Sequence, residues 1–250
     1  HAGGATLEKV ELVKAKGGSK EDVARQVRYE FFIRAAKKFK ADKIALAHTV
    51  DDQAETVLMR LIYGAGTTGL AGIPPTRKIN AYLIIRPFIE TARKNIDLFL
   101  KQNKIKPCID VTNDKEEFKR NKIRKQLLRL LEKEYNPNIK ETLARTAALL
   151  RDDRDLLDEV LLKKVFSDVI DVGAYCNTPL HKRLPCVKLN LKKYDILHIA
   201  LKKYVLRECI RIVNSHLTGI EYRHWRLLED FIAKRKDKAM WHLPRGCRAR

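Results

Sequence analysis

The sequence predicts an α/β domain, a parallel sheet with helices on both faces, followed by a smaller and mainly helical domain. In the first half, short apolar segments at residues 43–47 and 82–86 alternate with segments whose apolar residues recur at helical spacing. Strands separated by helices imply a parallel sheet with helices on its faces. After Pro137 the strand signals stop, and one apolar helical stripe continues from Ile139 to Leu161. This change predicts one domain at residues 1–136 and a second at residues 137–250.

The first half contains three predicted helices. Ser19 followed by Glu21 and Asp22 predicts a capped helix start, because acidic residues favour the first turn. Residues 51–63 and 91–102 have amphipathic patterns and predict the second and third helices. Residues 64–75 carry four glycines and a Pro-Pro pair, which together predict a long loop.

The second half begins with the long helical stripe, which runs from Ile139 to Leu161. Residues 168–185 are turn-rich and predict a linker, whereas residues 192–213 and 221–234 have helical patterns. The final residues, 240–248, end in a Pro-Arg-Gly turn. The second domain is therefore expected to consist of helices joined by loops.

The chain is strongly basic, with 52 Lys and Arg against 31 Asp and Glu and a net charge of +21. Between residues 181 and 250, 18 basic residues stand against 6 acidic ones. Such a surplus favours a polyanionic partner, most often nucleic acid, although a purely solubilising charge is the alternative. No apolar run is long enough to predict a membrane span, and five scattered cysteines without a CxxC pair indicate reduced thiols. We therefore expect a cytoplasmic protein with no membrane partner.

Residues 47–56, with the sequence AHTVDDQAET, follow a predicted strand and open a predicted helix. Open α/β sheets bind ligands at this position, beyond the carboxyl end of a parallel strand. Asp52 and Glu55 are three residues apart and share one face of the helix start, where two carboxylates can hold an amine or a metal ion. Helix capping by Asp51 or Asp52 explains the same residues equally well.

Several motifs resemble, in order and spacing, those of the tRNA(Ile)-lysidine synthase family, a branch of the PP-loop ATP pyrophosphatases. The motifs are Arg28-Tyr29-Glu30-Phe31-Phe32, AHTVDDQAET, residues 64–75, Ile85-Arg86-Pro87, Asp110-Val111-Thr112-Asn113 and Lys119-Arg120-Asn121-Lys122-Ile123-Arg124. They cover residues 18–150. The resemblance implies a Rossmann-like, adenine nucleotide alpha hydrolase-like catalytic domain and a helical tRNA-binding domain after it.

The resemblance implies a carbon–nitrogen ligase that uses ATP and Mg²⁺. Such an enzyme joins free L-lysine to C2 of the wobble cytidine in the CAU anticodon of isoleucine tRNA, through an adenylated cytidine, and gives lysidine, AMP and pyrophosphate. Arg28 and Arg124 match the family's catalytic arginines, whose planar fork suits phosphate oxygens. His48 matches an ATP-site position, and Asp52 and Glu55 match the acids that face lysine.

Arg86 is a further candidate for the nucleotide pocket, with a buried arginine that pairs with an acid as the alternative. Residues 115–133 carry eight basic residues against three glutamates and favour a tRNA backbone contact over a purely solvated face. The predicted tRNA-binding residues are Arg120, Lys122 and Lys125 in this stretch, and Lys192, Lys193, Lys202, Lys203 and Arg207 in the second domain. We predict no metal ligand, and the resemblance implies a homodimer.

The family's SGGxDS phosphate loop has no counterpart in the sequence. Gly3-Gly4 and Gly17-Gly18-Ser19 are comparable glycine pairs, but neither follows an apolar strand and ends in Asp-Ser. Because backbone amides of such a loop cradle pyrophosphate, we expect the chain as given to bind ATP poorly and to be inactive, and we attribute the gap to missing residues. The alternatives are a non-catalytic tRNA-binding relative and a tRNA thiolase of the same superfamily, although thiolases commonly use CxxC pairs.

Overall fold

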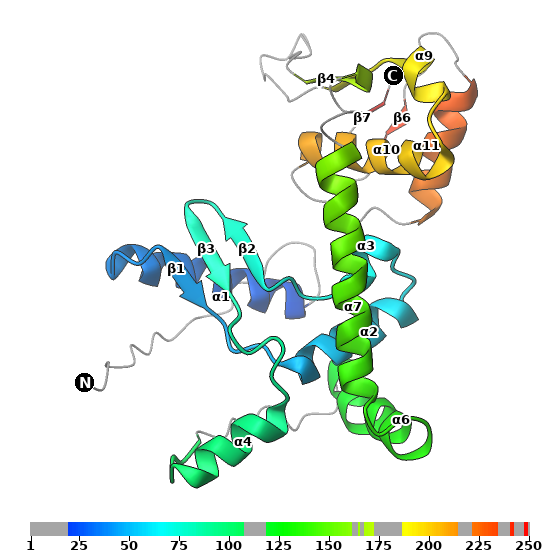
Figure 1. Ribbon diagram of the computed structural model, residues 1–250. Helices are drawn as coiled ribbons and strands as arrows, with labels where there is room; N and C mark the ends of the chain where they lie inside the picture. The colour runs from blue at the N-terminus through cyan, green and yellow to red at the C-terminus, as the bar shows by residue number, and fades with distance from the viewer. Residues whose placement is uncertain are drawn as a thin grey trace. The chain divides into compact units, whose positions relative to one another are not determined.

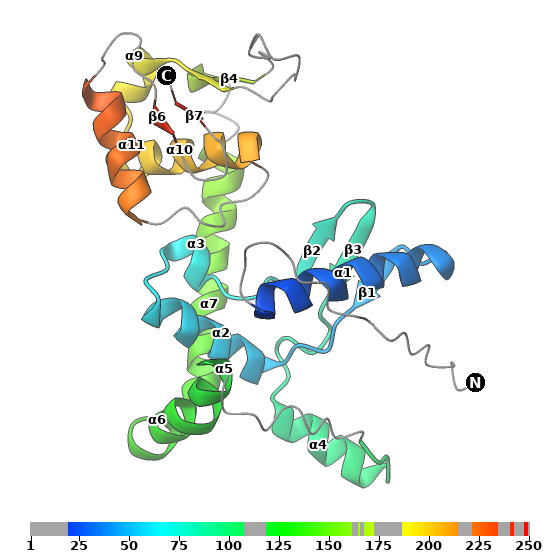
Figure 2. The ribbon, with the colours of Figure 1, turned by 180° about the vertical axis from the view of Figure 1, so that it is seen from behind.

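The computed structural model describes residues 20–107, 119–161, 165, 168–172, 187–214, 222–234, 241–242 and 248–249. Its contacts divide the chain into two compact units, His1–Arg154 and Asp155–Arg250. Figures 1 and 2 show the elements of both units from opposite sides. The division falls inside helix α7 (Ile139–Leu156), and the boundary predicted between residues 136 and 137 stays a prediction.

The first unit contains a three-stranded sheet in the order β1-β3-β2. Strands β1 (Lys43–Ala45) and β3 (Tyr82–Ile85) are parallel, with Ile44 opposite Ile84. Both strands were predicted. Strand β2 (Thr76–Ile79), which was not predicted, pairs antiparallel with β3 in a hairpin (Figure 1), so the sheet contains the predicted parallel pair and one antiparallel edge strand. Because β2 is mostly polar and exposed, it gives no apolar signal from which its strand could be predicted.

Helices account for most of the first unit. They are α1 (Lys20–Lys38), α2 (Val50–Ile62), α3 (Thr67–Leu70), α4 (Arg93–Gln102), α5 (Lys119–Lys122), α6 (Leu128–Glu134) and α7. A π-helical turn, η2 (Ile123–Leu127), joins α5 to α6, and a second, η3 (Leu157–Leu161), continues α7. The predicted helices at residues 51–63 and 91–102 and the long stripe to Leu161 are confirmed. The proposed cap at Ser19 lies outside the described residues.

A small apolar cluster fixes helix α2 against the chain that follows residue 119. Ala54 and Leu58 of α2 pack on Ile123 and Leu128, and all four side chains are buried. Leu127, Leu131 and other partly buried residues surround them. Because Ile123 lies between Arg120 and Arg124 in the sequence, this packing brings two basic side chains to the start of α2.

The second unit contains helices and two small antiparallel sheets. The elements are β4 (Ile170–Val172), β5 (Val187–Leu189), α9 (Leu191–Asp195), α10 (Ile199–Asn214), α11 (Tyr222–Lys234), β6 (Trp241–His242) and β7 (Arg248–Ala249). The helix predicted at residues 192–213 is broken after Asp195 into α9 and α10. Strand β4 lies within residues 168–185, which were predicted as a linker. This segment is a strand because it pairs with β5, a separate segment of the chain.

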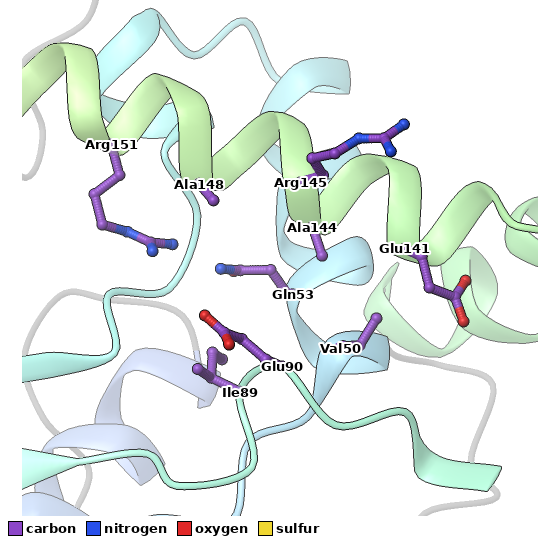
Figure 3. A pocket seen from close by; sticks show the side chains of 9 residues that line it. All are labelled: Val50, Gln53, Ile89, Glu90, Glu141, Ala144, Arg145, Ala148 and Arg151. Atoms are coloured by element: carbon purple, nitrogen blue, oxygen red, sulfur yellow. The ribbon is translucent and has the colours of Figure 1, made fainter. Parts of the chain in front are cut away.

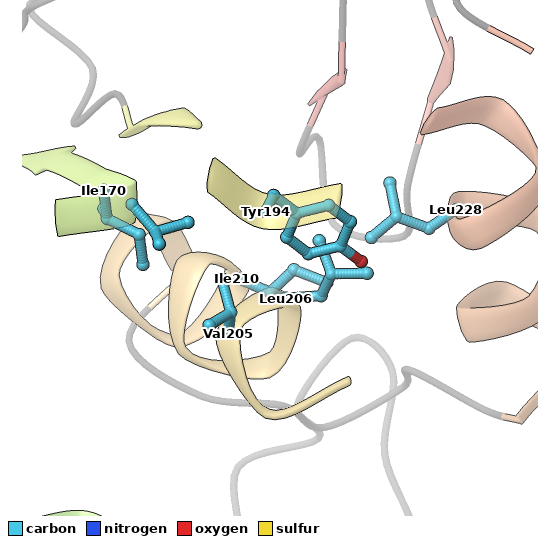
Figure 4. Packing of buried hydrophobic residues seen from close by; sticks show 7 residues of the cluster. Ile170, Tyr194, Val205, Leu206, Ile210 and Leu228 are labelled. Carbon is cyan, nitrogen blue, oxygen red and sulfur yellow. The ribbon is translucent and has the colours of Figure 1, made fainter. Parts of the chain in front are cut away.

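The core of the second unit is apolar. Seven buried residues form it: Val169, Ile170, Tyr194, Val205, Leu206, Ile210 and Leu228. Figure 4 shows their side chains, with the Tyr194 ring between α10 and α11. Burial raises the pKa of the Tyr194 hydroxyl to about 12, so this phenol stays neutral in the core. In neither unit is any described helix long and apolar enough to cross a membrane.

Candidate active site

The start of helix α2 is fixed by a capping box. The Thr49 hydroxyl accepts a hydrogen bond from the Asp52 N–H, and one Asp52 carboxylate oxygen accepts from the Thr49 N–H at 2.9 Å. This pattern satisfies two backbone donors that a helix start would otherwise leave without partners. Asp52 therefore does cap the helix, as the alternative interpretation expects, but only its Oδ2 atom is used.

The other Asp52 oxygen belongs to an acid–arginine cluster, which we define as Asp52, Glu55, Arg120 and Arg124. Arg120 donates from its Nε to Glu55 at 2.7 Å and from a terminal nitrogen to Asp52 Oδ1 at 2.9 Å. Arg124 donates to both Glu55 oxygens, at 2.5 and 3.1 Å. A terminal nitrogen of Arg124 also lies 3.9 Å from Asp52 Oδ1.

Glu55 is the buried centre of this cluster. Its side chain is 1% exposed, against 22% for Asp52, 29% for Arg120 and 44% for Arg124. A buried carboxylate is very costly unless it is paired and hydrogen bonded, and both guanidinium groups meet that requirement here. The hydrogen bond with Glu55 raises the pKa of Arg124 above its ordinary value and outweighs the opposing effect of burial.

The cluster joins chemical groups that suit two kinds of ligand. Carboxylates bind ammonium groups, and arginine forks bind phosphate or carboxylate oxygens two at a time. Arg120 and Arg124 are four residues apart, which places them on one face of the helical segment α5–η2. In this structure the arginines are bound to the acids, so a ligand amine would take the place of a guanidinium at Asp52.

Asp51, next to the cluster, connects three helices. Its Oδ2 atom accepts the Arg93 N–H at the first residue of α4, and its Oδ1 atom lies 3.1 Å from the Lys140 ammonium. Lys140 also lies 2.9 Å from Glu132 of α6. These contacts link the starts of α2, α4 and α7, and they hold the helix that carries the acids.

His48 and Arg86 lie at the carboxyl ends of the parallel strands β1 and β3. Arg86 is buried, donates to the Pro74 carbonyl at 2.7 Å, and donates from its Nε to His48 Nδ1 at 3.3 Å. The structure therefore brings together two residues that the sequence predicts for the nucleotide site. Both residues lie at the carboxyl edge of the sheet, where α/β folds bind ligands.

The glycine-rich loop is held by long polar side chains that the sequence analysis did not single out. Gln53 bonds both the N–H and the carbonyl of Ile73, at 2.6 and 3.0 Å, and Arg60 donates to the carbonyls of Gly69 and Gly72. Arg151 of α7 donates to the carbonyls of Ala71 and Ile73. Such long-range bonds to backbone atoms leave no periodic signal in the sequence.

A pocket of about 240 Å³ is lined in part by Gln53 and Arg151, two of the side chains that hold this loop. Its lining residues are Val50, Gln53, Ile89, Glu90, Glu141, Ala144, Arg145, Ala148 and Arg151. Gln53, Glu90 and Arg151 converge on it from three segments (Figure 3). Helical spacing places Val50 and Gln53 on a different face of α2 from Asp52 and Glu55, so the pocket and the acid–arginine cluster are separate features.

The other predicted site residues lie elsewhere. Arg28 is exposed on α1, and Lys122 is exposed beside the cluster. In the second unit, Lys192, Lys193 and Lys203 are exposed, whereas Lys202 lies 5.8 Å from the Tyr194 ring centre. Arg207 is half-buried, and burial lowers its pKa. The roles assigned to all these residues, and to Arg120 and Lys125, stay predictions.

An α/β unit with parallel strands, a helix start beyond their carboxyl ends and a charged cluster at that start defines a Rossmann-like ligand-binding domain. A family model described as a PP-loop domain matches residues 5–131, and the chain belongs to this family.

Curated relatives of the chain are tRNA(Ile)-lysidine synthases. The protein of Clostridioides difficile (strain 630) is 34% identical over 231 residues, which are 92% of this chain and 47% of that protein. The protein of Symbiobacterium thermophilum is 43% identical over 155 residues, which are 62% of this chain and 32% of the relative. The chain thus spans about half the length or less of the curated relatives it matches, and the resemblance predicted from the motifs is confirmed.

Among solved structures, a U34-tRNA thiolase from Methanococcus maripaludis resembles the chain with a TM-score of 0.43 and 20% sequence identity. The match covers 56% of this chain and 47% of the thiolase chain.

Proposed function

We propose that this chain, within its full-length protein, ligates L-lysine to C2 of the wobble cytidine in the CAU anticodon of isoleucine tRNA at the expense of ATP. The observation that carries the proposal is the acid–arginine cluster, in which two acids and two arginines of the family-like motifs meet within hydrogen-bond distance. Its location in a stretch similar to tRNA(Ile)-lysidine synthases supports the same reaction. We also propose a cytoplasmic location, where tRNA, ATP and free lysine all occur.

The first half of the proposed reaction is adenylation of the cytidine C2 oxygen, with pyrophosphate as the leaving group. This step needs positioned cations that stabilise phosphate charge, because little other chemistry is required of the protein. Arg124 fits the task, since its guanidinium is almost half exposed and permanently charged. Arg28 is the second proposed catalytic arginine, and His48 and Arg86 form the proposed nucleotide end of the site.

Mg²⁺ is implied by the use of ATP. Such an ion is commonly held by one or two carboxylates together with substrate phosphates and water. The described residues contain no group of three His, Cys, Asp or Glu side chains that could hold a metal ion. The phosphates would therefore supply most of its ligands, and among the described acids Asp52 is partly exposed at the site.

The second half of the reaction is attack by the lysine ε-amine on C2, with AMP as the leaving group. Asp52 and Glu55 are proposed to bind the α-ammonium group of lysine. Asp52 is the accessible acid, so the incoming ammonium exchanges with the Arg120 guanidinium at Oδ1. Glu55 keeps its bonds to Arg124 and holds the cluster together during that exchange.

The tRNA is proposed to bind along basic surfaces of both units. In the first unit the proposed contacts are Lys122 and Lys125, which lie beside the acid–arginine cluster in the sequence, and Arg120 of the cluster itself. In the second unit the proposed contacts are Lys192, Lys193, Lys202, Lys203 and Arg207. The net charge of +21 supports a phosphate-rich partner, because each neutralised phosphate releases bound counterions. A homodimer stays a prediction from the family resemblance.

The test is ATP-dependent incorporation of labelled lysine into isoleucine tRNA by the full-length protein. We expect incorporation into tRNA with a CAU anticodon and none into the same tRNA with a GAU anticodon, which lacks the acceptor cytidine. Omission of ATP should abolish incorporation. Binding of the CAU tRNA without any incorporation of lysine would refute the proposal and favour a non-catalytic tRNA-binding relative.

Arg124→Ala tests the catalytic assignment. We expect loss of lysine incorporation with tRNA affinity changed only a few-fold, because one arginine is a small part of a large basic surface. Arg129→Ala, an exposed arginine on neighbouring α6, is the matched control and should keep incorporation. Equal loss of binding and incorporation in Arg124→Ala would assign this residue to tRNA binding instead.

A further inference from the structure

Lys140 forms ion pairs with two acids that belong to different helices. Its ammonium group lies 3.1 Å from Asp51 Oδ1 at the start of α2 and 2.9 Å from Glu132 Oε1 on α6. All three side chains are partly buried, with 24% to 31% of each exposed. Burial alone would lower the pKa of Lys140, but the hydrogen bonds with Glu132 and Asp51 outweigh it and raise this pKa, so Lys140 is charged at neutral pH.

The location of Lys140 in its own helix is unfavourable for a cation. It is the second residue of α7, and the N–H groups at a helix start carry partial positive charge. An acid is the favoured residue there, and the next residue, Glu141, is one. The two acids of α2 and α6, rather than α7 itself, therefore account for the placement of Lys140.

These two acids lie on the two segments that form the acid–arginine cluster. Asp51 directly precedes Asp52, one of the acids of the cluster. Glu132 lies on α6, which continues α5–η2, the helical segment of both cluster arginines. Lys140 therefore joins the acid-bearing helix to the arginine-bearing segment at a second place, outside the cluster.

A second link matters because the cluster has to open for a ligand. In the proposed reaction, the ammonium group of lysine takes the place of the Arg120 guanidinium at Asp52 Oδ1. This exchange removes one of the bonds between the two segments. The ion pairs of Lys140 use Asp51 and Glu132, so the exchange at Asp52 leaves them intact.

We propose that Lys140 is a positioning residue that holds the acids of α2 in register with the two cluster arginines while Asp52 exchanges its partner. The identity of the ligand, L-lysine, rests on the proposed function, whereas the bridge follows from the contacts of Lys140 alone. Lys140 acts through Asp51 and Glu132 rather than on a substrate. Loss of the bridge should weaken the binding of lysine, which needs Asp52, more than the binding of ATP or tRNA.

Nitrogen NMR of labelled arginine in the full-length protein tests the bridge without any ligand. The Nε–H groups of Arg120 and Arg124 donate to Glu55, so their protons should be protected from exchange with water. Lys140→Met should speed this exchange about five- to tenfold, because two partly exposed ion pairs are lost. Arg120→Lys and Arg124→Lys assign the two signals by their disappearance. Unchanged exchange in a folded Lys140→Met protein would overturn the inference.

Three further variants locate the effect. Lys133→Met is the matched control, because Lys133 pairs with an acid of the same helix α6 but is 83% exposed, and it should leave the exchange unchanged. Lys140→Arg should keep the protection, since a guanidinium fork can serve both acids. Glu132→Gln cuts the bridge at its other end while Asp51 stays paired, so it should speed the exchange even if Lys140→Met does not fold. Full protection in Glu132→Gln would show that the two segments are not joined through Lys140.

Steady-state kinetics of lysine incorporation extends the test to the proposed reaction. Lys140→Met should raise the KM for lysine about tenfold and change the KM values for ATP and tRNA by less than about twofold. A residue that only stabilises the fold would lower the active fraction, and hence kcat, without this difference between substrates. Equal changes in all three KM values would overturn the positioning role. If the unmodified protein incorporates no lysine, the proposed function fails, whereas the exchange measurement still decides the role of Lys140.

Discussion

The interiors of the two units are built from different chemistry. The buried polar side chains among the described residues are Thr49, Gln53, Glu55, Thr56 and Arg86, all in the first unit. In the second unit the described core is apolar, with Tyr194 as its only polar member. Burial of apolar surface is favourable in any orientation and depends mainly on the area buried. A buried polar atom, by contrast, needs a hydrogen-bond partner at a particular position. The buried polar groups of the first unit therefore fix positions, in addition to an apolar cluster of the kind that forms the core of the second unit.

This difference explains why the proposed chemistry lies in the first unit. Three of these five buried polar groups are bonded to a distant part of the chain, Glu55 to Arg120 and Arg124, Gln53 to Ile73, and Arg86 to Pro74, whereas Thr49 and Thr56 bond to nearby Asp52. Loss of one partner leaves the other buried without compensation, which costs more than the net gain from the bond. Substitutions should therefore have site-specific effects in the first unit and effects that scale with buried volume in the second.

The largest effect is expected at Glu55. Glu55→Gln removes the charge that both guanidinium groups share and should lower the free energy of unfolding by about 3–5 kcal/mol. Lysine incorporation by the full-length protein should fall at least about 100-fold, since both arginines lose their anchor. Glu134→Gln is the control, because Glu134 is half exposed and forms an ion pair with Lys133, a neighbouring surface residue. It should change stability by less than about 0.5 kcal/mol. Urea denaturation and the incorporation assay measure both quantities, and equal effects of the two variants would contradict the comparison.

The apolar interior is tested by two adjacent leucines of α11. Leu228 is 5% exposed and Leu227 is 50% exposed. Leu228→Ala should destabilise the second unit by about 2–4 kcal/mol, because it removes buried methyl groups and leaves a cavity. Leu227→Ala should cost less than about 1 kcal/mol. Denaturation followed by Trp225 fluorescence reports on this core, since Trp225 packs against it. A similar cost for both leucines would mean that α11 does not pack as described.

The sequence predicted what depends on local spacing. Strands β1 and β3 follow from short apolar segments, and helices α2, α4 and α7 and the shared face of Asp52 and Glu55 follow from helical patterns. It could not predict that Arg120 bonds to acids about 65 residues earlier, since no local pattern encodes that contact. Gln53, Arg60 and Arg151 were missed for the same reason.

Strand β2 and the break between α9 and α10 were missed for related reasons. Strand β2 is a polar edge strand, so only its pairing with β3 identifies it. The break between α9 and α10 contains Ile196, Leu197 and His198, with neither Gly nor Pro to mark it. There the chain leaves the helix although Ile196 is left exposed, so the local apolar pattern alone does not decide where the helix ends. The site was therefore predictable as a set of residues but not as a set of contacts.

A smaller effect is expected at Gly72, in the loop that Gln53 holds. Gly72 has φ +66°, and a Cβ there would overlap the Gln53 side-chain amide. Gly72→Ala should therefore cost about 2 kcal/mol, from backbone strain and a displaced hydrogen bond. Gly66→Ala is the control, because Gly66 has open space around its Cβ position and φ −77°. Chemical denaturation should separate the two variants, and a neutral Gly72→Ala would show that the loop is not fixed by Gln53.

The smallest effect is expected at Asp51, on the border of the polar interior. Burial alone would raise the pKa of Asp51, but the Arg93 N–H and the Lys140 ammonium outweigh it and leave the pKa below the ordinary 3.8. A carboxyl with a lowered pKa in the folded state contributes stability above its unfolded pKa, and this contribution is lost as the pH falls through the folded value.

Asp51→Asn should therefore be about 1 kcal/mol less stable than the unmodified protein near pH 6, since it loses a charge-assisted hydrogen bond. The gap should begin to shrink near pH 3.8 and approach zero as the pH falls through the lower folded pKa of Asp51, because the native aspartate is protonated as well below that value. Subtraction of the two urea denaturation series removes the contribution of other acids. Asp97→Asn, at an exposed pair with Arg93, should show only a small gap at each pH. A stability difference that widens as the pH falls would mean that the effect of burial on the pKa of Asp51 outweighs the effects of Arg93 and Lys140. The ionised Asp51 carboxylate would then destabilise the folded protein.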